Sequence, residues 1–284
     1  MRVPKITPFA QRFAELRAQR GPFCLNLDPT PDLLKAWDLK DDIWGLRTFC
    51  NRVIDAADRS CAVIKPQSAY FERFGAAGFE VLADVIGSIQ AVGSLALLDA
   101  KRGDIGSTNR AYAEGLLGPE SAMAADGLTV HAYLGFGALS PLLEQARDFG
   151  CGIFAMVLSS NPEGRALQGA QLPDGRNVAE ALADEITAHN AAEQPEGVGP
   201  VGAVVGVTAE AAPELAKRLP RSLLLAPGLG AQGGSFEDVA LRFAGARERT
   251  LPCAGRSVLA AGPEPRALAA SISEYCQRAA DALA

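Results

Sequence analysis

Residues 97–109 read LLDAKRGDIGSTN and place two charged side chains at the end of an apolar strand. Asp99 and Lys101 are two positions apart, so on a strand their side chains point to the same face. A carboxylate and an ammonium in such surroundings are costly to bury unless they are paired. The stretch therefore predicts an ion pair at the strand end, which either only closes the structure or takes part in chemistry. Asp104 follows the strand, where it is also suited to cap a helix from Ile105 onward.

A second lysine ends the preceding apolar run, Cys61–Ile64. Neighbouring strands lie about 4.8 Å apart, so Lys65 is expected to reach Asp99. Lys65, Asp99, Lys101 and Asp104 would then alternate in charge. An aspartate repels a substrate carboxylate beside it, and a lysine stabilises and then protonates the carbanion left behind. The array suits a decarboxylation that requires no electron-sink cofactor.

Short apolar runs alternate with helical stretches along the whole chain. The runs are Phe23–Leu27, Cys61–Ile64, Ser94–Leu98, Gly127–Val130, Gly152–Leu158, Val201–Val207, Ser222–Leu225 and Pro252–Ala254. The helical stretches are Ile43–Asp58, Phe71–Val92, Ala138–Phe149, Val178–Asn190, Ala209–Arg218, Phe236–Glu248 and Pro265–Leu283. Continuous apolar runs are typical of strands buried on both faces, and the strand–helix alternation implies parallel crossovers. Eight such units predict an α/β protein of one domain, a (β/α)8 TIM barrel spanning residues 1–284.

Polar residues follow the strands, at the end of a barrel where active sites lie. The last two strands lead into PGLGAQGG, residues 227–234, and AGRS, residues 254–257. Glycine-rich backbone and an arginine at these two strand ends match a recurrent barrel phosphate site. The glycines also fit G-x-G-x-x-G, but the chain ends too soon after them for a dinucleotide-binding domain.

Composition narrows the function further. The chain has 284 residues, 48% of them apolar and 21% charged, with a net charge of −6. This balance predicts a large core and argues against nucleic acid as a partner. No apolar run approaches the roughly 18 residues of a membrane span, so we expect neither a membrane partner nor a membrane location. With two histidines and no C-x-x-C pair, the composition argues against a metal site.

The first twenty residues, MRVPKITPFAQRFAELRAQR, have no apolar core typical of a secretory signal. They predict an amphipathic helix over residues 1–20 that packs on the barrel, with Phe9, Phe13 and Leu16 on one face. Together with the cysteine pattern, which indicates buried reduced thiols, this predicts a cytoplasmic protein.

The motif Asp99-Ala-Lys101-Arg-Gly-Asp104-Ile105, with Thr108 following, closely resembles the signature of the orotidine 5′-phosphate decarboxylase family. The segments LNLDP, VIKPQSAYFE, LSSNPEG, APGLGAQGG and AGRS match in the family's order across nearly the whole chain. The wording D-A-K-R-G-D-I-G-S-T is similar to the longer bacterial subfamily rather than the short one. The resemblance implies a (β/α)8 barrel, conversion of orotidine 5′-phosphate to UMP and CO2 as the last step of UMP synthesis, and no cofactor.

The resemblance also implies roles for individual residues. Asp28 would hold a ribose hydroxyl, and Lys65 would contact the ribose and Asp99. Asp99 would press on the substrate carboxylate, and Lys101 would protonate C6 of the pyrimidine. The remaining implied contacts are Ser160, or Ser159 instead, to the pyrimidine; Gln232, Gly255 and Arg256 to phosphate; and Asp104, Ile105 and Thr108 to the partner subunit's site in a homodimer with shared active sites.

Two other functions remain open from the sequence. A Mg²⁺-dependent sugar-phosphate decarboxylase or aldolase of the same superfamily shares the Asp-x-Lys-x-x-Asp strand, but an acidic residue is expected where Lys65 stands. A nucleotide-binding sensor on a decayed barrel would not need all four charged residues. The long segment at residues 161–177 is either a partial lid or an insertion.

Overall fold

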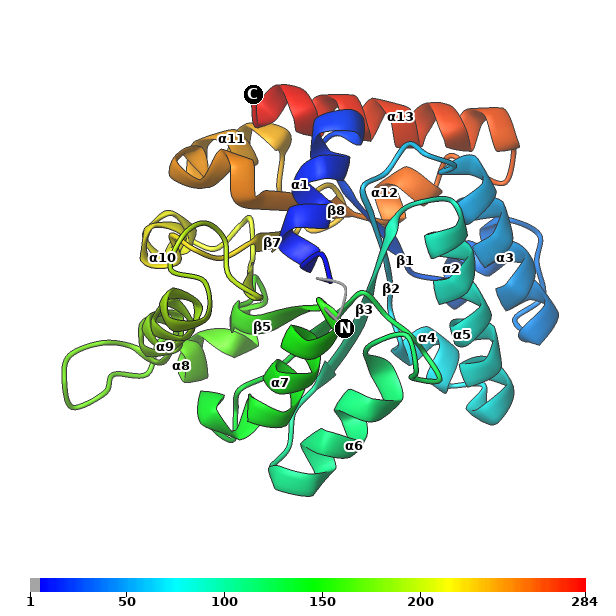
Figure 1. Cartoon of the computed structure of the whole chain (residues 1–284). Helices are drawn as coiled ribbons and strands as arrows, with labels where there is room; N and C mark the ends of the chain where they lie inside the picture. The colour runs from blue at the N-terminus through cyan, green and yellow to red at the C-terminus, as the bar shows by residue number, and fades with distance from the viewer. Residues whose placement is uncertain (1–5) are drawn as a thin grey trace.

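Eight parallel strands form a closed barrel in chain order in the computed structural model, which describes residues 6–284. The strands are β1 Cys24–Leu27, β2 Val63–Pro66, β3 Leu95–Arg102, β4 Gly127–Val130, β5 Gly152–Leu158, β6 Val201–Val205, β7 Leu224–Pro227 and β8 Thr250–Ala254. The barrel closes where Cys24 of β1 pairs with Cys253 of β8. The predicted single-domain (β/α)8 fold is confirmed, and the helices surround the strands (Figure 1).

The helices alternate with the strands as expected, with additions. They are α1 Phe9–Arg20, α2 Pro31–Ala36, α3 Ile43–Ala56, α4 Ala69–Glu72, α5 Gly75–Ala91, α6 Gly106–Leu116, α7 Ser140–Phe149, α8 Arg165–Gln168, α9 Val178–Glu193, α10 Ala212–Arg218, α11 Phe236–Arg242, α12 Arg256–Leu259 and α13 Pro265–Ala282. Three 3₁₀ turns accompany them: η1 Phe136–Leu139, η2 Pro162–Gly164 and η3 Ala244–Arg249.

Two expected helices are each broken in the structure. The stretch Phe71–Val92 divides into α4 and α5, because Gly75 has a positive φ of 62° and the chain turns there. The stretch Phe236–Glu248 ends as an α-helix at Arg242 and continues as η3. Apolar periodicity continues through both breaks, so periodicity alone does not locate them.

Helix α1 covers the amino-terminal end of the barrel. Phe9 and Phe13 are buried among inward-facing strand residues, and Leu16 packs against the same cluster. The Phe9 ring meets the Phe154 ring of β5 edge to face, with centroids 5.5 Å apart. The predicted apolar face is therefore confirmed, although residues 6–8 precede the helix and the part of the prediction covering residues 1–5 lies outside the described residues. Helix α1 lies across this end of the barrel (Figure 1), so a ligand site is expected at the opposite end.

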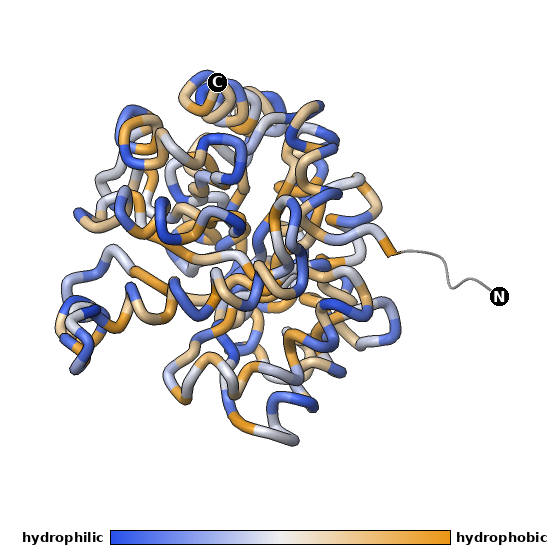
Figure 2. The backbone as a smooth tube through the Cα atoms, turned by 60° about the vertical axis from the view of Figure 1, so that its left-hand side comes forward, coloured by the Kyte–Doolittle hydropathy of each residue, from blue (hydrophilic) through white to orange (hydrophobic). Residues whose placement is uncertain are grey.

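The main core lies between the strands and the surrounding helices. Its members include Leu25 and Ile64 on the strands and Phe49 and Ile86 on the helices, all fully buried. Apolar residues therefore run through the interior while the helices alternate between apolar and polar positions (Figure 2). No helix among residues 6–284 combines the length and apolar character that crossing a bilayer requires.

Candidate active site

Two lysines hold the two oxygens of one buried carboxylate at the carboxyl end of the barrel. Lys65 Nζ lies 2.5 Å from Asp99 Oδ2, and Lys101 Nζ lies 2.5 Å from Asp99 Oδ1. The Lys65 and Asp99 side chains are nearly fully buried, whereas that of Lys101 is 44% exposed. One ammonium is therefore enclosed, while the other faces the space above the barrel.

The local backbone of β3 explains how Lys101 reaches this position. The pairing of β3 with β4 shifts register between Leu98 and Arg102, and Lys101 adopts a positive φ of 47°. Left-handed backbone at a non-glycine residue costs on the order of 1–3 kcal/mol and occurs preferentially at functional sites. Thr129 of β4 stabilises the distortion, because its hydroxyl accepts from Lys101 N at 3.0 Å and donates to Asp99 Oδ1 at 2.9 Å. Asp99 and Lys101 thus meet as predicted, but through a bulge rather than simple strand alternation.

The charges of this cluster hold one another in the ionised state. Burial disfavours the charge on Asp99, but Lys65 and Lys101 outweigh it and lower the pKa of that carboxyl below its usual value. Burial likewise opposes the charge on Lys65, but Asp99 and Asp28 outweigh it and raise the pKa of that ammonium. Asp99 and Lys65 are therefore both charged across the neutral pH range.

Asp28 follows β1 and lies beside the array with one oxygen unpaired. Burial raises the pKa of the Asp28 carboxyl, with Lys65 acting in the opposite direction. Its Oδ1 and the Oδ1 of Asn26 are buried and lack a hydrogen-bond partner within the described chain. A Cβ on Gly255 would come within 3.2 Å of Asp28 Oδ2, so a side chain at position 255 would crowd this carboxylate. Two buried acceptors without donors indicate a place where ligand hydroxyls bind.

A cavity of about 460 Å³ opens above the array and continues into a wider one of about 790 Å³. Asp28 and Gln232 line both, so the two cavities adjoin. The first is lined by Lys65, Asp99, Lys101 and Ser160 among others, and the second by Gly228, Gly255 and Arg256. Together they give an elongated site with the charge array at one end and an arginine at the other.

The glycine-rich segment after β7 forms a tight turn beside Arg256. Gly228 and Gly230 have φ values of 118° and 68°, which side chains rarely tolerate. A Cβ on Gly230 would meet the hydroxyl of Ser257 at 2.5 Å, so this turn packs directly on the residue after Arg256. The two segments that the sequence predicted to act together are adjacent in the fold.

Ser160 and Gln232 connect the loops after β5 and β7. The Ser160 hydroxyl donates to Gln232 Oε1 at 3.2 Å across the cavity. Ser159 lines the same cavity, but its hydroxyl and its backbone N–H contact the side chain of Gln168.

Asp104, Ile105 and Thr108 lie away from this cavity. None of the three is among the described residues lining either cavity, and Ile105 is 61% exposed. Asp104 Oδ1 accepts from Ile105 N at 2.7 Å, and Asn109 Oδ1 accepts from Asp104 N at 2.9 Å. The helix begins at Gly106 with Ile105 at its N-cap position, so Asp104 does not take the alternative role of an N-cap. The fourth charge of the expected alternation is therefore not supplied to this cavity by the same chain.

The sequence assigned no role to three polar residues of the site. Thr129 donates to Asp99, and Asn26 has a buried oxygen without a partner. The Gln67 amide, oriented to donate to the Asp99 carbonyl, accepts from Lys101 Nζ at 3.2 Å. Thr129 is the polar member of an otherwise apolar strand, and Gln67 comes two residues after Lys65. Each carried a signal, because a polar residue near a barrel strand end tends to face the site.

The donor set of this site does not suit a divalent cation. Any metal beside Asp99 would lie against the Lys65 and Lys101 ammonium groups, both 2.5 Å from its oxygens. Within residues 6–284, no group of three or more histidine, cysteine, aspartate or glutamate side chains is arranged to hold a metal ion.

Comparisons with known proteins agree with the geometry. Residues 21–272 match the model of the orotidine 5′-phosphate decarboxylase / HUMPS family. The orotidine 5′-phosphate decarboxylase of Myxococcus xanthus is 50% identical over 94% of this chain and 93% of its own length. That of Salinispora arenicola is 48% identical over 93% of this chain and 94% of its own. Among solved structures, a candidate orotidine 5′-phosphate decarboxylase from Streptomyces avermitilis superposes with a TM-score of 0.92 at 41% identity, covering 100% of this chain and 98% of that one.

Proposed function

The chain belongs to the orotidine 5′-phosphate decarboxylase / HUMPS family, and we propose that it converts orotidine 5′-phosphate to UMP and CO2 through the Lys65–Asp99–Lys101 array. The observation that carries this proposal is the array itself, in which one buried carboxylate is held between two ammonium groups. This is the last step of UMP synthesis, and the reaction is that for which its relatives at about half identity are named.

The array suits the breaking of a bond between carbon and a carboxylate. Asp99, kept ionised, repels the substrate carboxylate placed against it. The bond from C6 to the carboxyl carbon breaks, its electron pair stays on C6, and CO2 leaves. Lys101 stabilises that charge and donates a proton to C6. Its half-exposed side chain then recovers a proton from solvent.

The rest of the elongated site fits the nucleotide. Asp28 would accept from a ribose hydroxyl, which would satisfy its buried oxygen, and Lys65 would approach the ribose from the array. Ser160 would contact the pyrimidine, while Gln232, Gly255 and Arg256 would bind the phosphate. Binding energy at the phosphate end can then support chemistry at the other end of the site.

The site is completed by a second subunit in this proposal. Asp104, Ile105 and Thr108 project from the segment after β3, outside their own cavity. The loop after β4 meets this segment, since His131 N donates to Arg102 O at 3.0 Å. Ile105 in the segment and Tyr133 and Leu134 in the loop expose 61%, 74% and 51% of their surface. Large apolar side chains exposed together favour contact with a partner. A homodimer in which these residues enter the partner subunit's site accounts for both observations.

Cytoplasmic location is part of the proposal. All six cysteines are free and buried, which suits a reducing compartment.

Purified protein should cause the ultraviolet change that accompanies loss of orotidine 5′-phosphate, with equal rates before and after exhaustive chelation. The array supports metal independence, because two ammonium groups oppose a cation beside Asp99. The Lys101→Ala variant serves as the matched blank. Loss of the rate in chelator, restored by Mg²⁺, would instead support the sugar-phosphate lyase alternative.

A further inference from the structure

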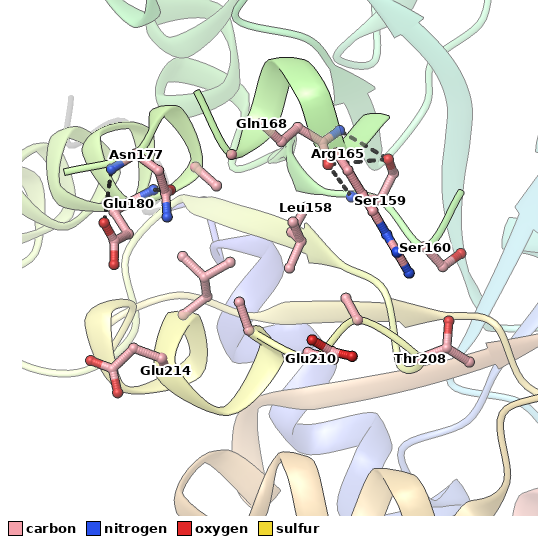
Figure 3. Close-up of a pocket in the computed structure, with 15 residues that line it drawn as sticks. Leu158, Ser159, Ser160, Arg165, Gln168, Asn177, Glu180, Thr208, Glu210 and Glu214 are labelled. Carbon is pink, nitrogen blue, oxygen red and sulfur yellow. Dashed lines mark hydrogen bonds between the residues drawn. The ribbon is translucent and has the colours of Figure 1, made fainter. Parts of the chain in front are cut away.

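A third cavity lies next to the active site, and the two are separated by a wall that includes Ser159, Ser160 and Thr208. It has a volume of about 260 Å³ and extends beneath the segment that follows β5 (Figure 3). Ser159, Ser160 and Thr208 line both this cavity and the central one. Anything that moves their backbone therefore changes the shape of the active site.

Gln168 of α8 holds this wall from the outer side. Its Oε1 accepts from Ser159 N at 3.0 Å, and its Nε2 donates to Ser159 Oγ at 2.9 Å (Figure 3). Gly164 allows the close packing, because a Cβ there would meet Ser159 Oγ at 2.6 Å and Gln168 Nε2 at 3.0 Å. The Gln168 amide thus binds both the backbone N–H and the hydroxyl of Ser159, the residue before Ser160.

The far end of the same segment is also anchored. Asn177 and Glu180 form a reciprocal capping box at the start of α9, with both hydrogen bonds at 2.9 Å (Figure 3). Between the anchors, residues 161–177 fold into η2, α8 and a bridge that pairs Gln171 with Asn177. The segment is consequently a folded cover rather than a plain connection.

The contacts of Gln168 distinguish the two neighbouring serines. The Ser159 hydroxyl binds Gln168, which lies outside the central cavity. The Ser160 hydroxyl instead donates to Gln232 across the central cavity. Fixing the backbone of Ser159 fixes where the next residue begins. Gln168, Ser159, Ser160 and Gln232 therefore form a continuous connection from the outer cover to the phosphate end of the site.

We propose that Gln168 is a positioning residue that holds Ser160 in place for the pyrimidine by fixing Ser159. This inference rests on the role proposed above for Ser160. Without Gln168, substrate binding must order the segment, and the cost is drawn from binding energy. The loss should therefore appear mainly as a raised KM, with kcat changed less.

The test is a double-variant cycle with steady-state kinetics on orotidine 5′-phosphate. Gln168→Leu should lower kcat/KM about tenfold, since two ordinary hydrogen bonds are lost. Gln168→Glu should stay within about threefold of the unmodified protein, because a carboxylate accepts from both the Ser159 N–H and the hydroxyl. Leu167→Ala, a change at an exposed neighbour on α8, is the matched control and should leave kcat/KM unchanged.

The Ser160→Ala background separates the possible outcomes. If Gln168 acts through Ser160, then Gln168→Leu should have little further effect once Ser160 is alanine. An equal, additive loss in that background overturns the inference, as does an unchanged KM for Gln168→Leu. If Ser160→Ala alone has no effect, the proposed role of Ser160 fails, and the inference fails with it. If Gln168→Leu also lowers the melting temperature, Gln168→Glu separates stability from positioning. A Gln168→Glu variant with normal stability but a raised KM would also contradict the inference.

Discussion

Lys65 binds Asp99 through one carboxylate oxygen only, with Nζ 2.5 Å from Oδ2, and this leaves Oδ1 for Lys101 and Thr129. The enclosed lysine neutralises the buried carboxylate without occupying the oxygen that Lys101 and Thr129 contact. The more exposed lysine is therefore free to meet substrate. This geometry therefore gives the two ammonium groups different roles: Lys65 neutralises the buried carboxylate, and Lys101 is placed to contact substrate.

Asp99→Asn should destabilise the protein strongly at neutral pH, because it removes the carboxylate that pairs directly with the buried Lys65 ammonium. Removing one partner of a buried pair costs roughly 3–5 kcal/mol. The lowered pKa of Asp99 means that its stabilising contribution is present above the unfolded value, about 3.9, and is lost as pH falls through the folded one. Urea unfolding between pH 8 and pH 4 should show the difference from the unmodified protein beginning to shrink only at the acid end.

Two further variants control this measurement. Asp84→Asn removes a carboxylate that pairs with Arg47 on the exposed surface, and should change stability by at most about 1 kcal/mol. The double variant Lys65→Met/Asp99→Leu should recover most of the lost stability while remaining inactive. A single Asp99→Asn variant as stable as the unmodified protein would contradict the charge account.

Asp28→Asn should stabilise the free protein and impair the reaction. The raised pKa of Asp28 shows that its ionised form is disfavoured in the fold, so the penalty applies above the unfolded pKa and disappears at lower pH. The melting temperature should rise at pH 7, with a smaller rise near pH 4. Loss of a charged acceptor for the ribose should cost roughly 1.5–3 kcal/mol, a tenfold to hundredfold or larger fall in kcat/KM.

Asp32→Asn is the matched control for this prediction. Asp32 lines the wider cavity from the first turn of α2 but is exposed. It should change neither stability nor kcat/KM appreciably. Destabilisation by Asp28→Asn at pH 7 would show that the unpaired carboxylate oxygen is stabilised in the free protein.

Arg256→Ala should lower kcat/KM for orotidine 5′-phosphate by an amount that corresponds to several kcal/mol of transition-state stabilisation. The reason is that a charge-assisted contact to a dianion also supports chemistry at the other end of the site. The same variant should act on the phosphate-free nucleoside nearly as the unmodified protein does. Arg266→Ala, at the exposed start of α13, is the control. A change within about threefold, near 0.65 kcal/mol, would place the phosphate elsewhere.

The barrel could be predicted from the sequence because the strands of a parallel barrel are buried on both faces and therefore appear as continuous apolar runs between helical stretches. Lys65, Asp99 and Lys101 could be located in the same way, because charged residues at the carboxyl ends of apolar barrel strands face the site. The sequence did not reveal the bulge at Lys101, because backbone strain depends on the Thr129 contact from a neighbouring strand. It also missed Gln168, whose importance comes from folding of a segment that reads as loop.

Asp104, Ile105 and Thr108 lie outside the cavity of their own subunit. Lys101 is proposed to act in its own subunit's site and Asp104 in its partner's, so Lys101→Ala and Asp104→Ala should each be nearly inactive as homodimers.

In a mixed dimer one site carries both changes and the other carries neither, because a two-fold interface exchanges residues reciprocally. Random reassortment makes about half the dimers mixed, so about a quarter of the unmodified activity should return. Subunits with different tags, mixed under mildly dissociating conditions, verify exchange by co-purification, and two differently tagged Lys101→Ala preparations provide the control that should remain inactive. Verified exchange without recovered activity would mean that Asp104 works in its own subunit or that the sites are not shared.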